Sequence, residues 1–157
     1  MTRVYRLLRK PFSKQPFDGE GSFRFGGRWS SAGTRIAYTS EHLSLAILEY
    51  FVHIGADHPP HDLVVATAEI PDGVSTTRVQ MEKLPATWRH TPPPAELAAM
   101  GDSFAGNKRA AVMIAPSVHA PNEANWLLNP QHPHFVRIKV RPSEPFSYDP
   151  RFFRYQV

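Results

Sequence analysis

The chain has 157 residues, of which 41% are hydrophobic and 20% are charged, and these values are ordinary for a globular domain. It contains no cysteine, which excludes disulfide bonds, thiolate zinc sites and a cysteine nucleophile. The net charge of +4 suits nucleic acid or a phosphate-bearing small molecule. However, the sequence has no lysine- and arginine-rich tract, and no apolar run reaches the roughly 18 residues of a membrane helix.

The basic side chains are concentrated in residues 1–40, whereas residues 41–96 are mainly acidic. The first residues also lack the apolar core of a signal peptide. We therefore expect one domain over residues 1–157, located in the cytoplasm, without membrane contact and without direct binding of nucleic acid.

Residues 4–8 predict a short first strand, and residues 35–39 predict a second one. The segment between them, residues 10–34, is rich in glycine, serine, phenylalanine and arginine and shows no period. A connection of that length without structure is uncommon in a compact domain, and it is usually functional.

A helix is predicted from about residue 41 to residue 54, with Ser40 as its N-cap and Gly55 at its end. Glu49 points away from the apolar face of this helix. The residues expected on that face, at the 3.6-residue period, are Leu43, Ile47, Tyr50, Phe51 and Ile54.

In the second half, residues 63–70 predict a strong strand and residues 94–100 a helix. Residues 111–114 predict a buried strand, which an asparagine-rich loop separates from an alternating strand over residues 135–140. Strands divided by mixed loops, with few helices, indicate an α+β fold.

The paired glycines of the run Gly26-Gly27-Arg28-Trp29-Ser30 allow the backbone to turn tightly and to approach a ligand. Arg28 beside them can bind a phosphate or a carboxylate with two donors. Neither a dinucleotide-binding motif nor a P-loop is present, so a glycine turn with a surface arginine explains the run equally well.

Tyr38 lies at the end of a predicted strand, and Glu49 lies on the helix predicted after it. A tyrosine ring can stack on a flat heterocycle, and a carboxylate in a pocket can stabilise an oxocarbenium-like centre. Taken singly, Tyr38 is also explained as a tyrosine at the edge of the core, and Glu49 as a solvated glutamate.

His42, Glu49 and His53 lie on one side of the same predicted helix, which raises the question of a metal site. At a rise of about 1.5 Å per residue the two histidines are roughly 16 Å apart. One metal ion cannot bind both, and no metal site is expected.

Ser117 follows Pro116 at a predicted strand end, with Asn122 and Asn125 shortly after it. A serine in this place can donate to a ligand phosphate or amide. The surroundings do not resemble G-x-S-x-G, so a nucleophilic serine is not favoured.

Three segments occur in an order that resembles the core of the RES-domain family: residues 26–33 (GGRWSSAG), 36–40 (IAYTS) and 46–50 (AILEY). The resemblance is strongest over residues 5–54 and 110–140.

Residues 4–7 are similar to the usual start of that family, and residues 116–130 are similar to its C-terminal signature. The family is named for an arginine, a glutamate and a serine, which by resemblance are Arg28, Glu49 and Ser117.

The resemblance implies an α+β fold like that of ADP-ribosyltransferase toxins, and a role as the toxin of a bacterial RES–Xre toxin–antitoxin module. The implied activity is attack on the nicotinamide–ribose bond of NAD+, above all phosphorolysis to nicotinamide and ADP-ribose 1″-phosphate. Hydrolysis and transfer of ADP-ribose to a protein are the alternatives with the same pocket. The implied partner is an Xre-like helix-turn-helix antitoxin whose C-terminal part blocks the site, and an oligomer with that antitoxin is allowed.

The arginine, tyrosine and glutamate of the family correspond to Arg28, Tyr38 and Glu49, and the chemistry of NAD+ suggests a catalytic role for each. Arg28 would bind the pyrophosphate, Tyr38 would stack on the nicotinamide, and Glu49 would stabilise the ribosyl cation. His53 would orient Glu49 or bind the attacking phosphate. The substrate is NAD+, inorganic phosphate is the co-substrate, and no further cofactor is implied. The NAD+-binding residues expected are Arg6, Arg28, Tyr38, Ser44, Glu49, His53, Ser117 and Asn125.

An alternative of a different class remains open, namely a basic module that binds nucleic acid or a protein without catalysis. Residues 72–107 match no motif and do not distinguish these functions.

Overall fold

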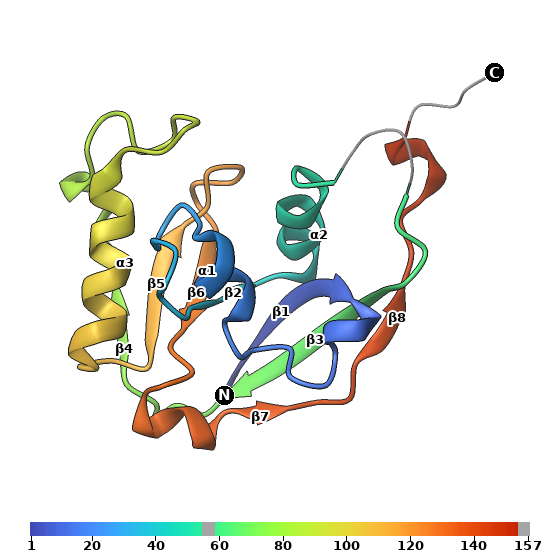
Figure 1. Cartoon of the computed structure of the whole chain (residues 1–157), viewed down its shortest axis with the longest axis horizontal. Coiled ribbons are helices and arrows are strands. Elements are labelled where there is room, and N and C mark those ends of the chain that lie inside the picture. Colours follow the sequence, from blue (N-terminus) through green and yellow to red (C-terminus); the bar gives the residue numbers. More distant parts are fainter. Residues whose placement is uncertain (55–58, 154–157) are drawn as a thin grey trace.

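The computed structural model describes residues 1–54 and 59–153, which form one mixed sheet with helices packed against it (Figure 1). The strand order is β4-β5-β6-β2-β1-β3-β7, and β8 also pairs with β3. Only β4 and β5 are parallel among these described pairs. The strands are β1 (Thr2–Arg9), β2 (Ala37–Ser40), β3 (Leu63–Ile70), β4 (Thr76–Arg78), β5 (Val112–Pro116), β6 (Ala124–Leu128), β7 (Lys139–Val140) and β8 (Glu144–Phe146).

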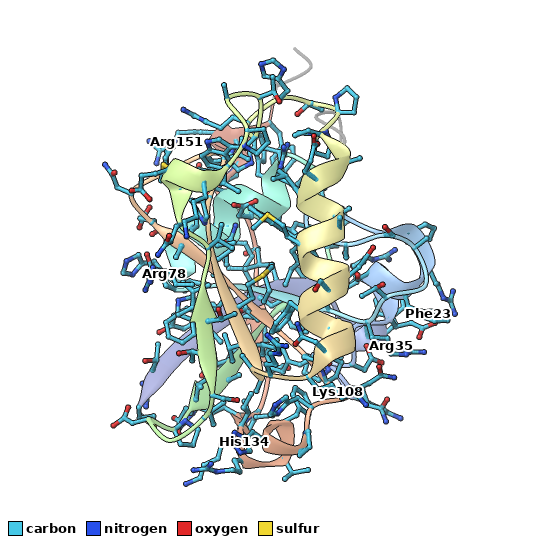
Figure 2. The ribbon with its side chains drawn as sticks, turned by 90° about the vertical axis from the view of Figure 1, so that its left-hand side faces the viewer. Phe23, Arg35, Arg78, Lys108, His134 and Arg151 are labelled. Carbon is cyan, nitrogen blue, oxygen red and sulfur yellow. The ribbon has the colours of Figure 1, made fainter. Side chains whose placement is uncertain are left out.

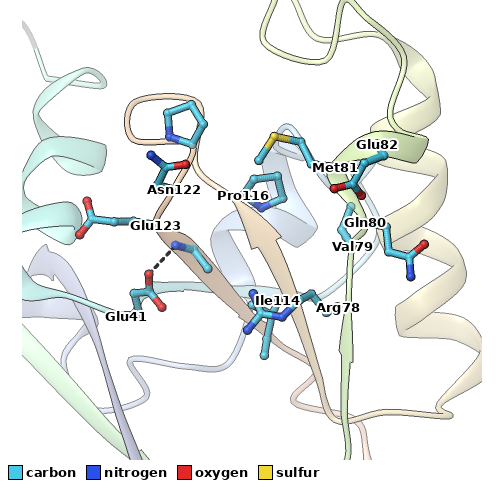
Figure 3. Close-up of a pocket in the computed structure, with 12 residues that line it drawn as sticks. Glu41, Arg78, Val79, Gln80, Met81, Glu82, Ile114, Pro116, Asn122 and Glu123 are labelled. Atoms are coloured by element: carbon cyan, nitrogen blue, oxygen red, sulfur yellow. Dashed lines mark hydrogen bonds between the residues drawn. The ribbon is translucent and has the colours of Figure 1, made fainter.

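Short and longer helices alternate with these strands. The α-helices are α1 (Glu20–Phe25), α2 (Leu43–Phe51) and α3 (Ala95–Asn107). Single 3-10 turns are η1 (Lys10–Phe12), η2 (Met81–Lys83), η3 (Pro133–Arg137) and η4 (Pro150–Phe152). Figures 1 and 3 show α2 and α3 on either side of the β5–β6 pair. The expected α+β class is confirmed.

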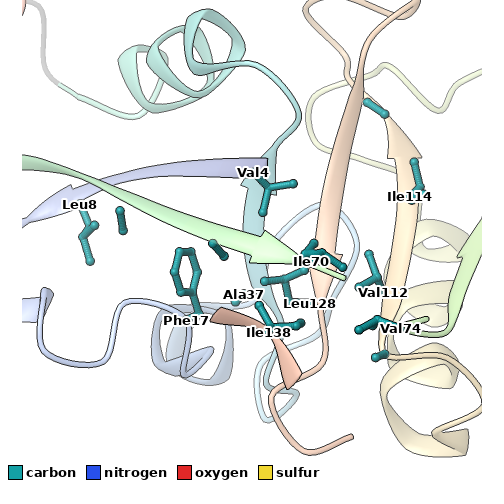
Figure 4. Packing of buried hydrophobic residues seen from close by; sticks show 14 of the residues in the cluster. Val4, Leu8, Phe17, Ala37, Ile70, Val74, Val112, Ile114, Leu128 and Ile138 are labelled. Atoms are coloured by element: carbon teal, nitrogen blue, oxygen red, sulfur yellow. The ribbon is translucent and has the colours of Figure 1, made fainter. Parts of the chain in front are cut away.

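Strands β1 and β3 pair along their whole length, from Thr2 opposite Ile70 to Arg9 opposite Leu63. Because side chains alternate across a strand, β1 supplies apolar residues to both faces of the sheet. Val4 on one face lies in the largest buried cluster (Figure 4), together with Leu128 of β6. The opposite face of β1 packs against α2.

Helix α2 is attached to that opposite face and to the C-terminal segment. Ala46 of α2 lies in one buried cluster with Leu7 of β1 and with Tyr148. The Tyr148 hydroxyl donates to the carbonyl of Ile47 at 2.6 Å, and Phe51 contacts the ring of Tyr148. Helix α2 therefore has a fixed position on the sheet.

Helix α3 lies against the segment that contains Arg28. A Cβ at Gly101 would overlap the carbonyl oxygen of Trp29, so only glycine permits this approach. Trp29 is buried beside Leu97 of the same helix. The backbone next to Arg28 is thus held directly on α3.

The segment predicted to be structureless, residues 10–34, contains the turn η1 and the helix α1. Helix α1 is tied to the following loop by Arg35, whose Nη1 binds Glu20 at 2.7 Å. The same guanidinium lies over the ring of Phe23, at 4.5 Å from its centroid (Figure 2). These contacts form between residues more than ten positions apart, which a local period does not reveal.

The predicted strands over residues 4–8, 35–39, 63–70 and 111–114 correspond to β1, β2, β3 and β5. The helix over residues 94–100 exists and extends further, to Asn107.

Two predictions about helix α2 were wrong. Ser40 belongs to β2, and the N-cap position is taken by His42, whose extended backbone precedes the first turn. Leu43 is 37% exposed, because the helix begins only at this residue and its first turn buries Leu45 and Ala46 instead. The predicted end at Gly55 lies outside the described residues.

The strand predicted over residues 135–140 was also largely wrong. Residues 133–137 form the turn η3, and only the two residues of β7 pair with β3. Residues 124–128 were expected to be a loop, yet they form β6 between β5 and β2.

Candidate active site

Glu49 lies on α2 beside the ends of β5 and β6, and its carboxylate is hydrogen bonded to both. Ser117, directly after β5, donates its hydroxyl to Glu49 Oε1 at 2.7 Å. Asn125 of β6 donates Nδ2 to the same oxygen, also at 2.7 Å. Two donors on one carboxylate oxygen fix the rotation of the whole group.

The two donors are themselves held in place. Ser40 and Asn125 are cross-strand partners of β2 and β6, and the Ser40 hydroxyl donates to Asn125 Oδ1 at 2.8 Å. The Ser117 hydroxyl oxygen accepts from the backbone N–H of His119 at 3.1 Å. Glu49 is thus positioned by a network that extends into the sheet.

The second oxygen of Glu49 faces the imidazole of His119. The separation between His119 Nε2 and Glu49 Oε2 is 3.7 Å, and each side chain is 27% exposed. Within the described residues, Glu49 Oε2 accepts no hydrogen bond. This oxygen is therefore the part of Glu49 that a ligand can reach.

Arg28 is anchored by backbone oxygens of the connection between β4 and α3. Its Nη1 donates to the carbonyls of Trp88 at 2.9 Å and His90 at 2.8 Å, and Nη2 lies 3.4 Å from the Thr91 hydroxyl. Burial lowers the pKa of Arg28 from the usual range of a guanidinium, while the charge of Glu49 acts in the opposite direction. None of the oxygens bound by Arg28 carries a charge, so its positive charge remains available to an anion.

Tyr38 supports the turn that carries Arg28. Its hydroxyl accepts from the N–H of Trp29 at 3.1 Å and shares a hydrogen bond with the Ser30 hydroxyl at 2.7 Å. Burial raises the pKa of Tyr38 to about 12, so the phenol is protonated at neutral pH. Because the hydroxyl is occupied internally, only the ring of Tyr38 is free to contact a ligand.

Two of the predicted NAD+-binding residues are hydrogen bonded to Glu49. Ser117 is fully buried, and its hydroxyl donates to Glu49. Asn125 donates to Glu49 with its amide nitrogen and accepts from Ser40 with its amide oxygen. In this structure both residues position Glu49, and their contact with NAD+ stays a prediction.

Three other predicted residues are not linked to Glu49 by hydrogen bonds in the described part of the chain. Ser44 and His53 are exposed on and just after α2. Arg6 lies on the face of β1 that carries Val4, near Gly21 of α1. Burial lowers the pKa of the Arg6 guanidinium.

Residues that the sequence did not reveal also surround the site. His119 lies within residues 116–130, the segment similar to the family's C-terminal signature, but the sequence did not single it out as a site residue. Trp88 and His90 act through backbone carbonyls, for which no side-chain pattern exists.

Two hollows lie in the surface of the described part of the protein. One, of about 340 Å³, is bounded by Arg78 and Met81 on one side and by Glu41 and Asn122 on the other (Figure 3). Two residues of its wall are connected by a hydrogen bond from the N–H of Ala124 to Glu41 Oε1, at 2.7 Å. The other, of about 630 Å³, lies between the segment 14–20 and η3. Neither hollow includes Glu49 or Arg28, so the candidate site is defined by the chemistry of its residues and not by a hollow.

Within residues 1–54 and 59–153, no three histidine, aspartate or glutamate side chains are grouped so as to hold a metal ion. No helix in that part of the chain has the length and apolar character to cross a membrane.

The chain belongs to the RES domain family, whose model matches residues 3–149. It is 33% identical over 147 residues to the Prs ADP-ribosylating toxin of a Sphingobium species, covering 92% of this chain and 91% of that protein. It is 31% identical over 150 residues to the toxin Res of Yersinia enterocolitica, covering 94% of this chain and 97% of that protein.

The fold is also similar to a solved structure, the crystal structure of the MbcT–MbcA toxin–antitoxin complex of Mycobacterium tuberculosis. The similarity has a TM-score of 0.72 and covers 96% of this chain and 85% of that chain, at 15% sequence identity. At this identity the likeness concerns the fold alone.

Proposed function

We propose that this RES-domain protein is a toxin that cleaves the nicotinamide–ribose bond of NAD+ in the cytoplasm, with inorganic phosphate as the acceptor of the ADP-ribosyl group. The observation that supports the proposal is the different bonding of the two carboxylate oxygens of Glu49. One of its oxygens is fixed by Ser117 and Asn125, and the other accepts no hydrogen bond from the described residues. The charge of Glu49 also acts on Arg28, whose guanidinium is bound only by neutral oxygens.

The chemistry of NAD+ matches this arrangement. When nicotinamide leaves, the electron pair of the glycosidic bond neutralises its pyridinium nitrogen, so departure needs no general acid. The developing ribosyl cation needs stabilisation, and Glu49 Oε2 supplies a negative charge and an acceptor for a ribose hydroxyl. Arg28 binds the pyrophosphate with its remaining N–H donors, and the ring of Tyr38 stacks on the nicotinamide.

The proposal includes an antitoxin partner. Curated relatives are named toxins, and the similar solved structure is a toxin bound to an antitoxin. We propose an Xre-like helix-turn-helix antitoxin that covers the Glu49 site, which is tested by measuring whether the co-purified partner inhibits nicotinamide release.

A second candidate is transfer of ADP-ribose to a protein, and the name of the Sphingobium relative favours it. The pocket would be the same, with a protein side chain in place of phosphate. Labelled NAD+ separates the two activities, because only protein transfer leaves the label on a polypeptide.

The test is to incubate purified protein with NAD+, with and without inorganic phosphate, and to follow the products by phosphorus NMR. Phosphate-dependent release of nicotinamide with formation of ADP-ribose 1″-phosphate supports the proposal. Release that is independent of phosphate points to hydrolysis or protein transfer. No release under either condition refutes the enzymatic function and favours a binding module.

A further inference from the structure

The arginines of this protein differ in the charge of their partners. Several form ion pairs with carboxylates, namely Arg3, Arg9, Arg24, Arg35, Arg141 and Arg151. Within the described residues, the guanidinium groups of Arg28, Arg89 and Arg137 bind only neutral oxygens, and of these Arg28 and Arg89 are held by or belong to the segment 88–91. A guanidinium held by carbonyls keeps its charge for an anion.

Arg89 is placed by the same backbone segment that anchors Arg28. The carbonyls of Trp88 and His90 bind Arg28, while Arg89 between them points its Nη2 to the carbonyl of Val118 at 2.8 Å. The segment 88–91 therefore connects Arg28 with the turn that follows β5. Figure 1 shows this connection beside the β5–β6 loop.

The carbonyl that binds Arg89 belongs to the peptide directly before His119. The imidazole of His119 in turn faces the open oxygen of Glu49 at 3.7 Å. Arg89 is exposed and has further N–H donors beyond the one used for Val118. His119 thus lies against the open oxygen of Glu49, and the Arg89 guanidinium is bound to the peptide directly before His119.

We propose that Arg89 and His119 form the acceptor subsite and bind an oxyanion, inorganic phosphate, next to Glu49. This assignment rests on the proposed function, because it specifies which residues hold the second substrate of that reaction. Arg28 serves the pyrophosphate of NAD+, and Arg89 with His119 serves the phosphate.

The reaction at this subsite balances without any other reagent. An oxygen of HPO4²⁻ forms the bond to C1 of the ribose as the bond from C1 to nicotinamide nitrogen breaks. The electron pair stays on that nitrogen and the phosphate keeps its proton, so the products are nicotinamide and ADP-ribose 1″-phosphate. Arg89 and His119 offset the repulsion between the phosphate and Glu49.

The kinetic test uses Arg89→Met and His119→Gln, with nicotinamide release measured across a phosphate series at saturating NAD+. Each variant is expected to raise the half-saturating phosphate concentration at least about tenfold and to leave the KM for NAD+ within about twofold. Unchanged phosphate dependence in both variants overturns the assignment.

Matched controls are Arg137→Met and His42→Gln. Arg137 is also an exposed arginine bound to one carbonyl, that of Gly73 at 3.0 Å. His42 is also a histidine near a carboxylate, 3.4 Å from Glu123. Neither residue contacts the site, and both variants are expected to behave as the wild type.

A binding measurement separates the subsite from turnover. Inorganic phosphate is titrated calorimetrically into the wild type and into the Arg89→Met/His119→Gln double variant at constant ionic strength. Binding by the wild type that is lost in the double variant supports the subsite even if NAD+ is not cleaved. Equal binding by both proteins, or none by the wild type, overturns it, whereas absence of nicotinamide release refutes only the proposed function.

Discussion

Ser117 and Glu49 lie 68 positions apart in the chain, and the serine hydroxyl donates to the carboxylate at 2.7 Å. The serine is fully buried, so its effect on a reaction reaches the substrate only through Glu49. We therefore expect the family's serine to act in this chain by positioning the glutamate.

Replacing Ser117 with alanine is expected to lower kcat for nicotinamide release by about 10- to 100-fold with little change in the KM for NAD+. Glu49 loses one of the two donors that fix Oε1, and a misplaced carboxylate costs rate more than binding. Ser13→Ala, at an exposed serine bonded to the Lys10 carbonyl at 2.7 Å, is the control. A rise in KM with unchanged kcat would instead indicate direct contact between Ser117 and NAD+.

Glu49→Gln is expected to reduce nicotinamide release by about 1,000-fold or more, because the amide keeps the shape of the side chain and removes its charge. Circular dichroism should show an unchanged fold, and Glu123→Gln on the same side of the sheet is the control. Substantial activity of the Glu49→Gln variant would refute the role proposed for this residue.

Arg28→Lys is expected to raise the KM for NAD+ by about tenfold or more. An ammonium group cannot bind the carbonyls of Trp88 and His90 and also present two parallel donors to a pyrophosphate. The measurement is the NAD+ dependence of nicotinamide release. Arg109→Lys, at an exposed arginine outside the site, is the control and should leave this KM unchanged. An unchanged KM in the Arg28→Lys variant would mean that the pyrophosphate binds elsewhere.

Gly101→Ala is expected to destabilise the protein by about 3 kcal/mol or more, since the new methyl group overlaps the Trp29 carbonyl. Gly106 lies on the same helix, and a Cβ there would meet no atom within 4 Å. Gly106→Ala should therefore stabilise the helix by about 0.5–1 kcal/mol. Urea unfolding measures both changes, and similar effects of the two variants would contradict this packing.

Glu69 is expected to make stability sensitive to acid. The hydrogen bond from Arg141, at 2.6 Å, lowers the pKa of Glu69 below its usual range. A carboxylate with a lowered pKa stabilises the folded state above its unfolded pKa of about 4.3, and this contribution is lost as the pH falls further.

The check is urea unfolding between about pH 6 and pH 3. Glu69→Gln should lower stability at pH 6 and show a shallower decline toward pH 3 than the wild type. Glu144→Gln, at an exposed glutamate of β8, should keep the wild-type decline. If the stability of the Glu69→Gln variant declines toward pH 3 as steeply as that of the wild type, other groups cause the sensitivity to acid.

The strands of residues 63–70 and 4–8 could be predicted because their branched and apolar side chains signal extended structure locally. Strand β6 could not, since Asn125 and Trp126 follow a proline- and asparagine-rich turn and resemble a loop. Its extended form depends on pairing with β5 and β2. Such pairing joins residues distant in the chain, which no local pattern encodes.

The same distinction applies to the site. Arg28, Tyr38, Glu49 and Ser117 were identified through ordered motifs. The hydrogen bond from Ser117 to Glu49 depends on the packing of α2 beside the end of β5, which the sequence does not encode locally. His119 lies in the signature segment 116–130, but its position opposite Glu49 exists only in the folded chain.

The anchoring of Arg28 by the carbonyls of Trp88 and His90 has a consequence for how this region tolerates change. Every amino acid contributes a carbonyl, so the chemical identity of residue 90 is immaterial to the anchor, while the path of the backbone is decisive. A library of substitutions at His90 should leave the arginine seated, whereas deleting one residue from 88–91 should release it. Position 90 can therefore change between related proteins as long as the length of the segment is kept, whereas Trp88 is also held by its place in the core.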